Sequence, residues 1–296
     1  MQFFSSKDWK RFLTELYDKV VDTDVLGNAA QIAFYFSFAF FPLLLFLVSL
    51  FGMLLESTEG LKSELYAYLA QLMPGSAYTL VRDTMEEVVE NSSGSKLTFG
   101  LLITLYSASA GVDNLRSGLN SVYEETEKRS WWWSKLLALF LTLLFIVLIG
   151  IALAAVAAGW KLVQVGFQTV DLEVTSPFIL ISVQWVSVIV VMVFVTAVTY
   201  SVLPSFKEFK WVWISPGAVV AILLWIALTG GFKLYLQYFN TYNKTYGSLG
   251  AVIILMLWMY FTAVAVLIGG AINSVLTEMS EADKEEGDLA ASTDLI

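Results

Sequence analysis

The stretch NAAQIAFYFSFAFFPLLLFLVSLFG, residues 28–52, decides the fold class of this 296-residue chain. It lies within a run of 31 uncharged residues between Asp24 and Glu56. An α-helix rises about 1.5 Å per residue, so about 20 apolar residues cross the roughly 30 Å hydrocarbon core of a bilayer. The run is therefore long enough to form a membrane-spanning helix.

Five more charge-free runs follow. They contain 16, 25, 33, 22 and 33 residues, at 97–112, 136–160, 174–206, 211–232 and 245–277. The whole chain is 57% hydrophobic and 15% charged, with a mean hydropathy of +0.71. Continuously apolar runs favour helices over a β-barrel, whose strands alternate in polarity. The sequence therefore predicts an all-α, polytopic membrane protein with six transmembrane helices and short amphipathic helices at the interface.

The predicted organisation is a single membrane domain, residues 1–276, followed by an acidic tail, residues 277–296, that we expect to be disordered and cytoplasmic. Residues 9–20 alternate apolar and charged groups at helical spacing. They predict a short amphipathic helix on the membrane surface or, as an alternative, one packed on a cytoplasmic loop. The long loop 56–96 should carry two more amphipathic helices and an acidic outer face.

Basic residues predict the orientation. If the amino terminus is cytoplasmic, the inner side carries 11 of the 17 Lys and Arg residues and the outer side carries 6. We therefore expect both termini to be cytoplasmic in a multi-pass protein.

The residue types limit the available chemistry. The chain has no His and no Cys, which excludes histidine-based acid–base pairs, thiol nucleophiles, disulfides and the usual zinc sites. Acidic clusters such as Glu124-Glu125-Glu127 are interpreted as solvated faces. The net charge of −9 argues against nucleic acid as a partner. The sequence predicts a protein that is not an enzyme and has no catalytic residues, metal or cofactor.

Three segments resemble the YihY/BrkB family of bacterial inner-membrane proteins, formerly labelled ribonuclease BN-like. They are AAQIAFYFSFAFFPLLLFLVSLFG (29–52), SASAGVDNLRSGLNSVYE (107–124) and the longer 202–273, with Pro-Gly at 216–217 and Tyr-Gly-Ser-Leu-Gly-Ala-Val at 246–252. The resemblance implies six transmembrane helices in the bacterial cytoplasmic membrane. Many relatives carry an acid at the position of Ala271. The resemblance therefore does not imply a proton-coupled mechanism for this chain.

Polar side chains within the apolar runs are the candidate pathway residues. An unsatisfied polar group in lipid costs on the order of 2–7 kcal/mol, so these side chains should face protein or water. With both termini inside, an inner group comprises Asn28, Gln31, Asp113, Arg116, Asn120 and Asn273. An outer group comprises Lys233, Gln237 and Tyr246. We predict a cavity between helices that has these two polar groups at its opposite ends and an apolar middle between them.

Pro42 predicts a kink in the first spanning helix, and Tyr35 lies before it, where a cavity could form. Structural alternatives remain open. The Pro42 kink can serve packing, Lys233 can extend its amine to the interface, and Asp113 and Arg116 can form a simple ion pair.

Two classes of function fit this pattern. The first is a transporter that handles a lipid or amphiphilic solute, with membrane lipids and an anionic lipid-like substrate as partners. The second is a non-transporting envelope scaffold that binds a partner through the acidic outer loop. Small residues, Gly269, Gly270 and Ser274 as well as Ala154 and Ala158, predict close helix contacts within a monomer or in a homo-oligomer.

Overall fold

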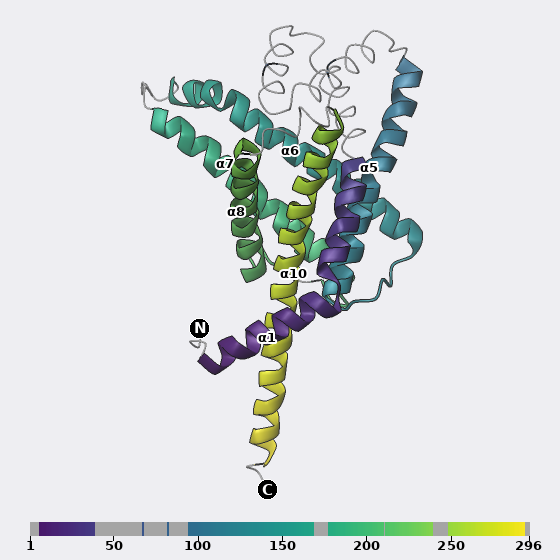
Figure 1. Ribbon diagram of the computed structural model, residues 1–296, viewed down its shortest axis with the longest axis vertical. Coiled ribbons are helices and arrows are strands. Elements are labelled where there is room, and N and C mark those ends of the chain that lie inside the picture. Colours follow the sequence, from purple (N-terminus) through teal and green to yellow (C-terminus); the bar gives the residue numbers. More distant parts are fainter. Residues whose placement is uncertain are drawn as a thin grey trace.

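The computed structural model describes residues 6–38, 94–168, 177–209, 211–238 and 248–293, together with residues 67 and 82. Every regular element in these residues is a helix, so the predicted all-α class is confirmed. The helices are α1 (Ser6–Asp22), α5 (Gly94–Val122), α6 (Trp131–Gln168), α7 (Pro177–Val202), α8 (Pro216–Tyr238) and α10 (Ser248–Thr293) (Figure 1). Residues Val25–Phe38 are also helical and follow α1 after a short turn.

The apolar helices are those of a membrane protein. Within the described residues, three stretches are long and apolar enough to cross a bilayer: Trp131–Ala152, Pro216–Tyr235 and Val252–Glu285. Val25–Phe38 and Val186–Val202 are shorter apolar helices. Large apolar side chains such as Phe140 and Leu223 are exposed on these elements, as lipid-facing residues would be. The number of six spans stays a prediction.

α10 is the central helix of the packing. It contacts α8, α5 and α1. Leu267 and Ala271 of α10 are fully buried in one cluster with Leu119 of α5 and Ile32. A Cβ added at Gly270 would lie 3.0 Å from Leu119, and one at Gly269 would meet Ala221 of α8 at 2.8 Å. The predicted close contacts at these two glycines are therefore made within the chain, because side chains of neighbouring helices fill the space beside them.

α1 is the predicted amphipathic helix at the amino terminus. It crosses the carboxyl-terminal half of α10 (Figure 1). Phe12 is buried against Ile272, Val275 and Met279 of α10. The adjoining face exposes a second apolar stripe, formed by Trp9, Leu13, Tyr17 and Val21, with Trp9 stacked on Phe12. The protein surface that receives α1 is thus a helix, rather than the cytoplasmic loop considered from the sequence.

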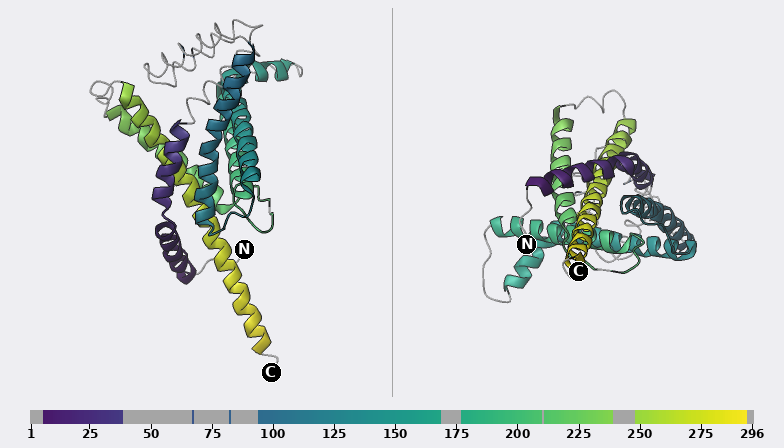
Figure 2. Two further views of the ribbon diagram at one scale, coloured as in Figure 1. Left: turned by 90° about the vertical axis from the view of Figure 1, so that its right-hand side faces the viewer. Right: turned by 90° about the horizontal axis from the view of Figure 1, so that it is seen from below.

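The described residues after Thr277, where we expected a disordered tail, belong to α10. α10 continues without interruption to Thr293, and its end extends away from the other helices (Figure 2). Contacts with α1 support the first part of this segment, as far as Asp283: Met279 packs on Phe12, and Arg11 lies 3.5 Å from Asp283. The acidic composition of this segment indicated solvation, but it does not prevent a helix that has a packing partner.

Several predictions lie outside the described residues. They include the two amphipathic helices of the loop 56–96, the kink at Pro42 and the position of Tyr246. The side chains of Ala154 and Ala158 also lie outside the described part of α6.

Candidate functional site

The end of α5 carries three of the predicted pathway residues on one face. Asp113, Arg116 and Asn120 are spaced by three and four positions, which places them on successive turns of one side of a helix. Arg116 lies 3.5 Å from Asp113 and donates a hydrogen bond to Glu127. The ion pair between Asp113 and Arg116, considered from the sequence, is therefore present, and Glu127 adds a second carboxylate.

Two other segments complete this network. Lys135 of α6 donates to Asp113 at 3.0 Å. The Asn120 side chain donates to Glu127 at 3.3 Å and accepts a hydrogen bond of 2.8 Å from the backbone N–H of Ser205, in the loop after α7. We call these six residues the polar layer: Asp113, Arg116, Asn120, Glu127, Lys135 and Ser205. The layer joins α5, α6 and two loops at one end of the apolar helices.

Glu127 is the carboxylate that the polar layer shares most widely. Burial alone would raise its pKa. The hydrogen bond from the Arg129 amide and the charge and hydrogen bond of Arg116 outweigh burial, so the pKa of Glu127 lies below its usual 4.5. The interpretation of Glu127 as part of a solvated face is therefore wrong: its side chain is held by three segments of the chain.

Arg129 closes the carboxyl end of α7. Its guanidinium donates hydrogen bonds to the carbonyl oxygens of Val202, Leu203 and Pro204, at 3.2, 3.3 and 2.6 Å. The last carbonyls of a helix have no partner within the helix, and a cation there also interacts favourably with the helix dipole. Arg129 thereby holds the α5–α6 loop against the end of α7.

Asn273 of α10 performs the equivalent task at the start of α8. It accepts a hydrogen bond of 2.8 Å from the Gly217 N–H and donates one of 2.9 Å to Ser215. The Ser215 hydroxyl also accepts from the Ala218 N–H, so Ser215 caps the first turn of α8, which begins at Pro216. Asn273 is thus occupied in joining α10 to the amino terminus of α8.

Lys19 ties α1 to the same end of the molecule. It is 8% exposed and donates to Glu124 at 2.6 Å and to Glu278 at 2.7 Å. Burial by itself favours the neutral amine. The hydrogen bonds to Glu124 and Glu278 and the charges of these carboxylates outweigh burial and raise the pKa of Lys19 above its usual 10.5.

The other predicted residues are not part of the polar layer. Asn28 donates to the Thr23 carbonyl at 2.8 Å. Gln31, Tyr35 and Lys233 are exposed at the surface of the described structure. Gln237 belongs to α8, but its side chain is not among those described. Glu127, Lys135 and Ser205 were not predicted from the sequence to be partners of the pathway residues. A signal existed for Lys135, which directly precedes the charge-free run 136–160 and should therefore lie at the end of a span.

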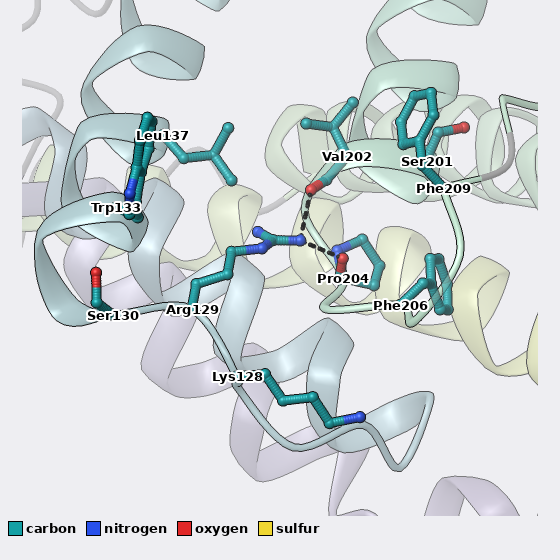
Figure 3. A pocket seen from close by; sticks show the side chains of 10 residues that line it. All are labelled: Lys128, Arg129, Ser130, Trp133, Leu137, Ser201, Val202, Pro204, Phe206 and Phe209. Atoms are coloured by element: carbon teal, nitrogen blue, oxygen red, sulfur yellow. Dashed lines mark hydrogen bonds between the residues drawn. The ribbon is translucent and has the colours of Figure 1, made fainter.

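A pocket of about 600 Å³ lies beside the polar layer. Trp133 and Leu137 of α6 face it from one side, and Phe206 and Phe209, in the loop after α7, face it from the other (Figure 3). Lys128 and Arg129 belong to the same lining. The predicted pathway residues do not line this pocket.

Comparison with known proteins identifies the family. The sequence model of the family described as Virulence factor BrkB matches residues 16–294. The ribonuclease-like protein YfkH of Bacillus subtilis (strain 168) is 29% identical over 265 residues, which cover 90% of this chain and 94% of the relative. No solved structure matches this chain. Because the family match extends over nearly the whole chain, this protein belongs to the BrkB family of membrane proteins.

Proposed function

We propose that this protein is a six-span, multi-pass protein of the bacterial cytoplasmic membrane that moves a lipid or amphiphilic solute between its helices. In this proposal both termini are cytoplasmic, which the distribution of Lys and Arg supports. The three long apolar stretches and the two shorter apolar helices support the spans. The polar layer then lies at the cytoplasmic end of the bundle.

The observation that carries the proposal is the polar layer itself. It connects α5, α6 and two loops through polar side chains at the end of a bundle whose middle is apolar. Rearrangement of ion pairs between elements is one of the ways in which proteins switch between two arrangements. In the proposal, the layer is the closed inner gate of a path for amphiphiles.

Arg116 is the residue in the layer that a solute would contact. Its side chain is 15% exposed, and its guanidinium is paired with Glu127 and Asp113. The buried Nε has no hydrogen-bond partner among the described residues. Because Glu127 and Asp113 occupy its guanidinium, Arg116 is not free to bind an anionic head group in this arrangement. A solute anion would have to replace Glu127 as the partner of the Arg116 guanidinium.

The scaffold alternative is favoured by the number of hydrogen bonds that hold Glu127 in the polar layer. Glu127 alone has partners in Arg116, Asn120 and Ser205. A network of this kind is also consistent with a rigid bundle whose cytoplasmic end does not open. The acidic loop 56–96, through which the scaffold would bind a partner, lies outside the described residues. A homo-oligomer stays a prediction.

A transfer assay separates the two functions. The full chain is reconstituted in vesicles, and movement of a labelled anionic phospholipid between leaflets is followed by chemical quenching of the label. We expect wild-type protein to move the lipid faster than empty vesicles. Arg116→Ala should slow transfer by about tenfold, because the charge-assisted hydrogen bond between Arg116 and the lipid phosphate is lost. Lys233→Ala should slow it to a smaller extent.

The matched control is Lys284→Ala, which removes an exposed cation from the end of α10. This variant should move lipid as fast as the wild type, and a melting curve of each variant shows whether it folds. If wild-type protein moves no lipid faster than empty vesicles, across a panel of head groups, the transporter is excluded and the scaffold takes its place.

A further inference from the structure

We propose that the pocket between α6 and the loop after α7 is a binding site for an anionic phospholipid, with Lys128 facing the phosphate and the aromatic walls receiving the start of an acyl chain. This inference deepens the proposed function and rests on it for its biological role. The binding itself is measured independently of transport.

The charged residues that line the pocket are both cations, although Glu125 and Glu127 each lie 3.9 Å from one of them. Lys128 and Arg129 are the charged residues in its lining, and no carboxylate lines it. Arg129 is occupied by three carbonyl oxygens at the end of α7. Lys128 is 51% exposed, and Glu125 lies 3.9 Å from its amine. At that distance the ion pair is loose, so the Lys128 amine can turn to an incoming anion.

The amino terminus of α6 adds to this field. α6 begins at Trp131, and its first-turn residue Trp133 lines the pocket. The amino-terminal end of a helix carries a partial positive charge, which favours an anion nearby. Arg129, Lys128 and this helix end therefore act in the same direction.

The walls of the pocket are apolar. Trp133 and Leu137 of α6 face Phe206 and Phe209 (Figure 3). Trp133 is 69% exposed even though it lines the pocket, so the apolar wall continues onto the outer surface of α6. A hydrated anion such as free phosphate gains nothing from such walls, whereas a phosphate that carries an acyl chain does. The volume of about 600 Å³ fits a head group and part of one chain.

In the membrane, the pocket would lie at the depth of the lipid head groups. Trp131 and Trp132 stand exposed beside Trp133, and Trp213 is exposed in the loop after α7. Tryptophans gather at the membrane–water interface, with apolar residues on the lipid side. Further along α6, Leu136 and Phe140 are exposed and apolar. A lipid in the surrounding leaflet would thus meet the mouth of the pocket with its phosphate at the level of Lys128.

The test measures lipid binding to the purified full chain in maltoside detergent by native mass spectrometry. Phosphatidylglycerol and phosphatidylcholine of identical acyl chains are added at increasing concentration. We expect phosphatidylglycerol to bind about fivefold more tightly, the contribution of one lysine near an anionic lipid surface. Lys128→Gln should remove this preference. Trp133→Ala should weaken the binding of both lipids, because both contact the wall.

Lys10→Gln is the control, since it removes an exposed cation from α1, away from the pocket. It should keep the fivefold preference. Equal binding of the two lipids by the wild type, or an unchanged preference in Lys128→Gln, overturns the inference. Displacement of phosphatidylglycerol by millimolar inorganic phosphate also overturns it, because the ligand would then be a free phosphate. Binding with no lipid transfer in vesicles leaves the site in place and removes only the transport function.

Discussion

Gly217 of α8 and Gly269 of α10 bring the backbones of two helices into direct contact. A methyl group at Gly217 would overlap the carbonyl oxygen of Gly269, and the Gly217 N–H donates to Asn273 one turn further along α10. The start of α8 is therefore fixed both by shape and by a hydrogen bond. In a membrane, such small residues allow the close packing on which helix association depends.

Gly217→Ala should destabilise the protein, because the added methyl group must separate α8 from α10. We expect the free energy of unfolding to fall by about 1–3 kcal/mol, the usual cost of overpacking. Unfolding by sodium dodecyl sulfate, followed by circular dichroism, measures this. Gly230→Ala, on the same helix, is the control, since a methyl group there has no atom within 4 Å. Equal effects of the two substitutions would contradict the close contact.

The polar layer should lose stability in acid. The folded-state pKa of Glu127 is lower than its usual 4.5, so the ionised carboxylate stabilises the folded protein above pH 4.5. This contribution is lost as the pH falls from 4.5 through the lower folded-state pKa. Glu127→Gln should therefore melt below the wild type at pH 7, and the difference should shrink in acid.

At pH 7 the free energy of unfolding of Glu127→Gln should be about 1–3 kcal/mol lower than that of the wild type, since Arg116 is left without its main partner. Glu281→Gln, at an exposed position on α10, is the control and should differ little from the wild type at either pH. A constant difference for Glu127→Gln between pH 7 and pH 3 would show that its charge is not what stabilises the layer.

Lys19→Met should loosen α1 from α10, because the substitution removes both hydrogen bonds to Glu124 and Glu278. The expected result is faster hydrogen–deuterium exchange in α1, with Lys10→Met as an exposed control on the same helix. The folded-state pKa of Lys19 is raised, so its stabilising effect is complete below pH 10.5 and is lost at higher pH. Unchanged exchange in Lys19→Met would mean that Phe12 packing alone holds α1.

The orientation follows from the Lys and Arg distribution and can be tested with introduced cysteines, since the chain has none. A cysteine substituted for Ser92, in the predicted outer loop, should react with an impermeant thiol reagent in intact cells. A cysteine substituted for Ser292 should react only after the cells are opened. The reverse labelling pattern would place both termini outside.

The purified protein should not cleave tRNA, although its relative from Bacillus subtilis carries a ribonuclease-like name. The chain has no His for acid–base catalysis and a net charge of −9, which repels phosphate. A gel assay with labelled tRNA measures cleavage. Activity that survives stringent purification, and disappears when Glu124, Glu125 and Glu127 are changed to Gln, would show that this protein is a nuclease.

The sequence by itself determined the local properties. Charge-free runs indicated apolar helices, because hydrogen bonding within each helix is the simplest way to satisfy the backbone in lipid. The three-residue spacing of Asp113 and Arg116 allowed an ion pair between them as one alternative, and the structure contains it. These features depend on neighbours within one or two helical turns, which a sequence displays directly.

Only the tertiary structure decided which polar groups meet. Lys19 pairs with Glu124 and Glu278, 105 and 259 positions away, and no periodicity in the chain links them. Gln31 was expected in an inner polar group but lies exposed, since the face of a helix that turns inward depends on the helices beside it. The part of α10 that follows Thr277 gains a packing partner in α1 as far as Asp283, which the sequence did not indicate. Composition predicts whether a segment favours water or an apolar environment. The residues that it contacts are set by packing over the whole chain.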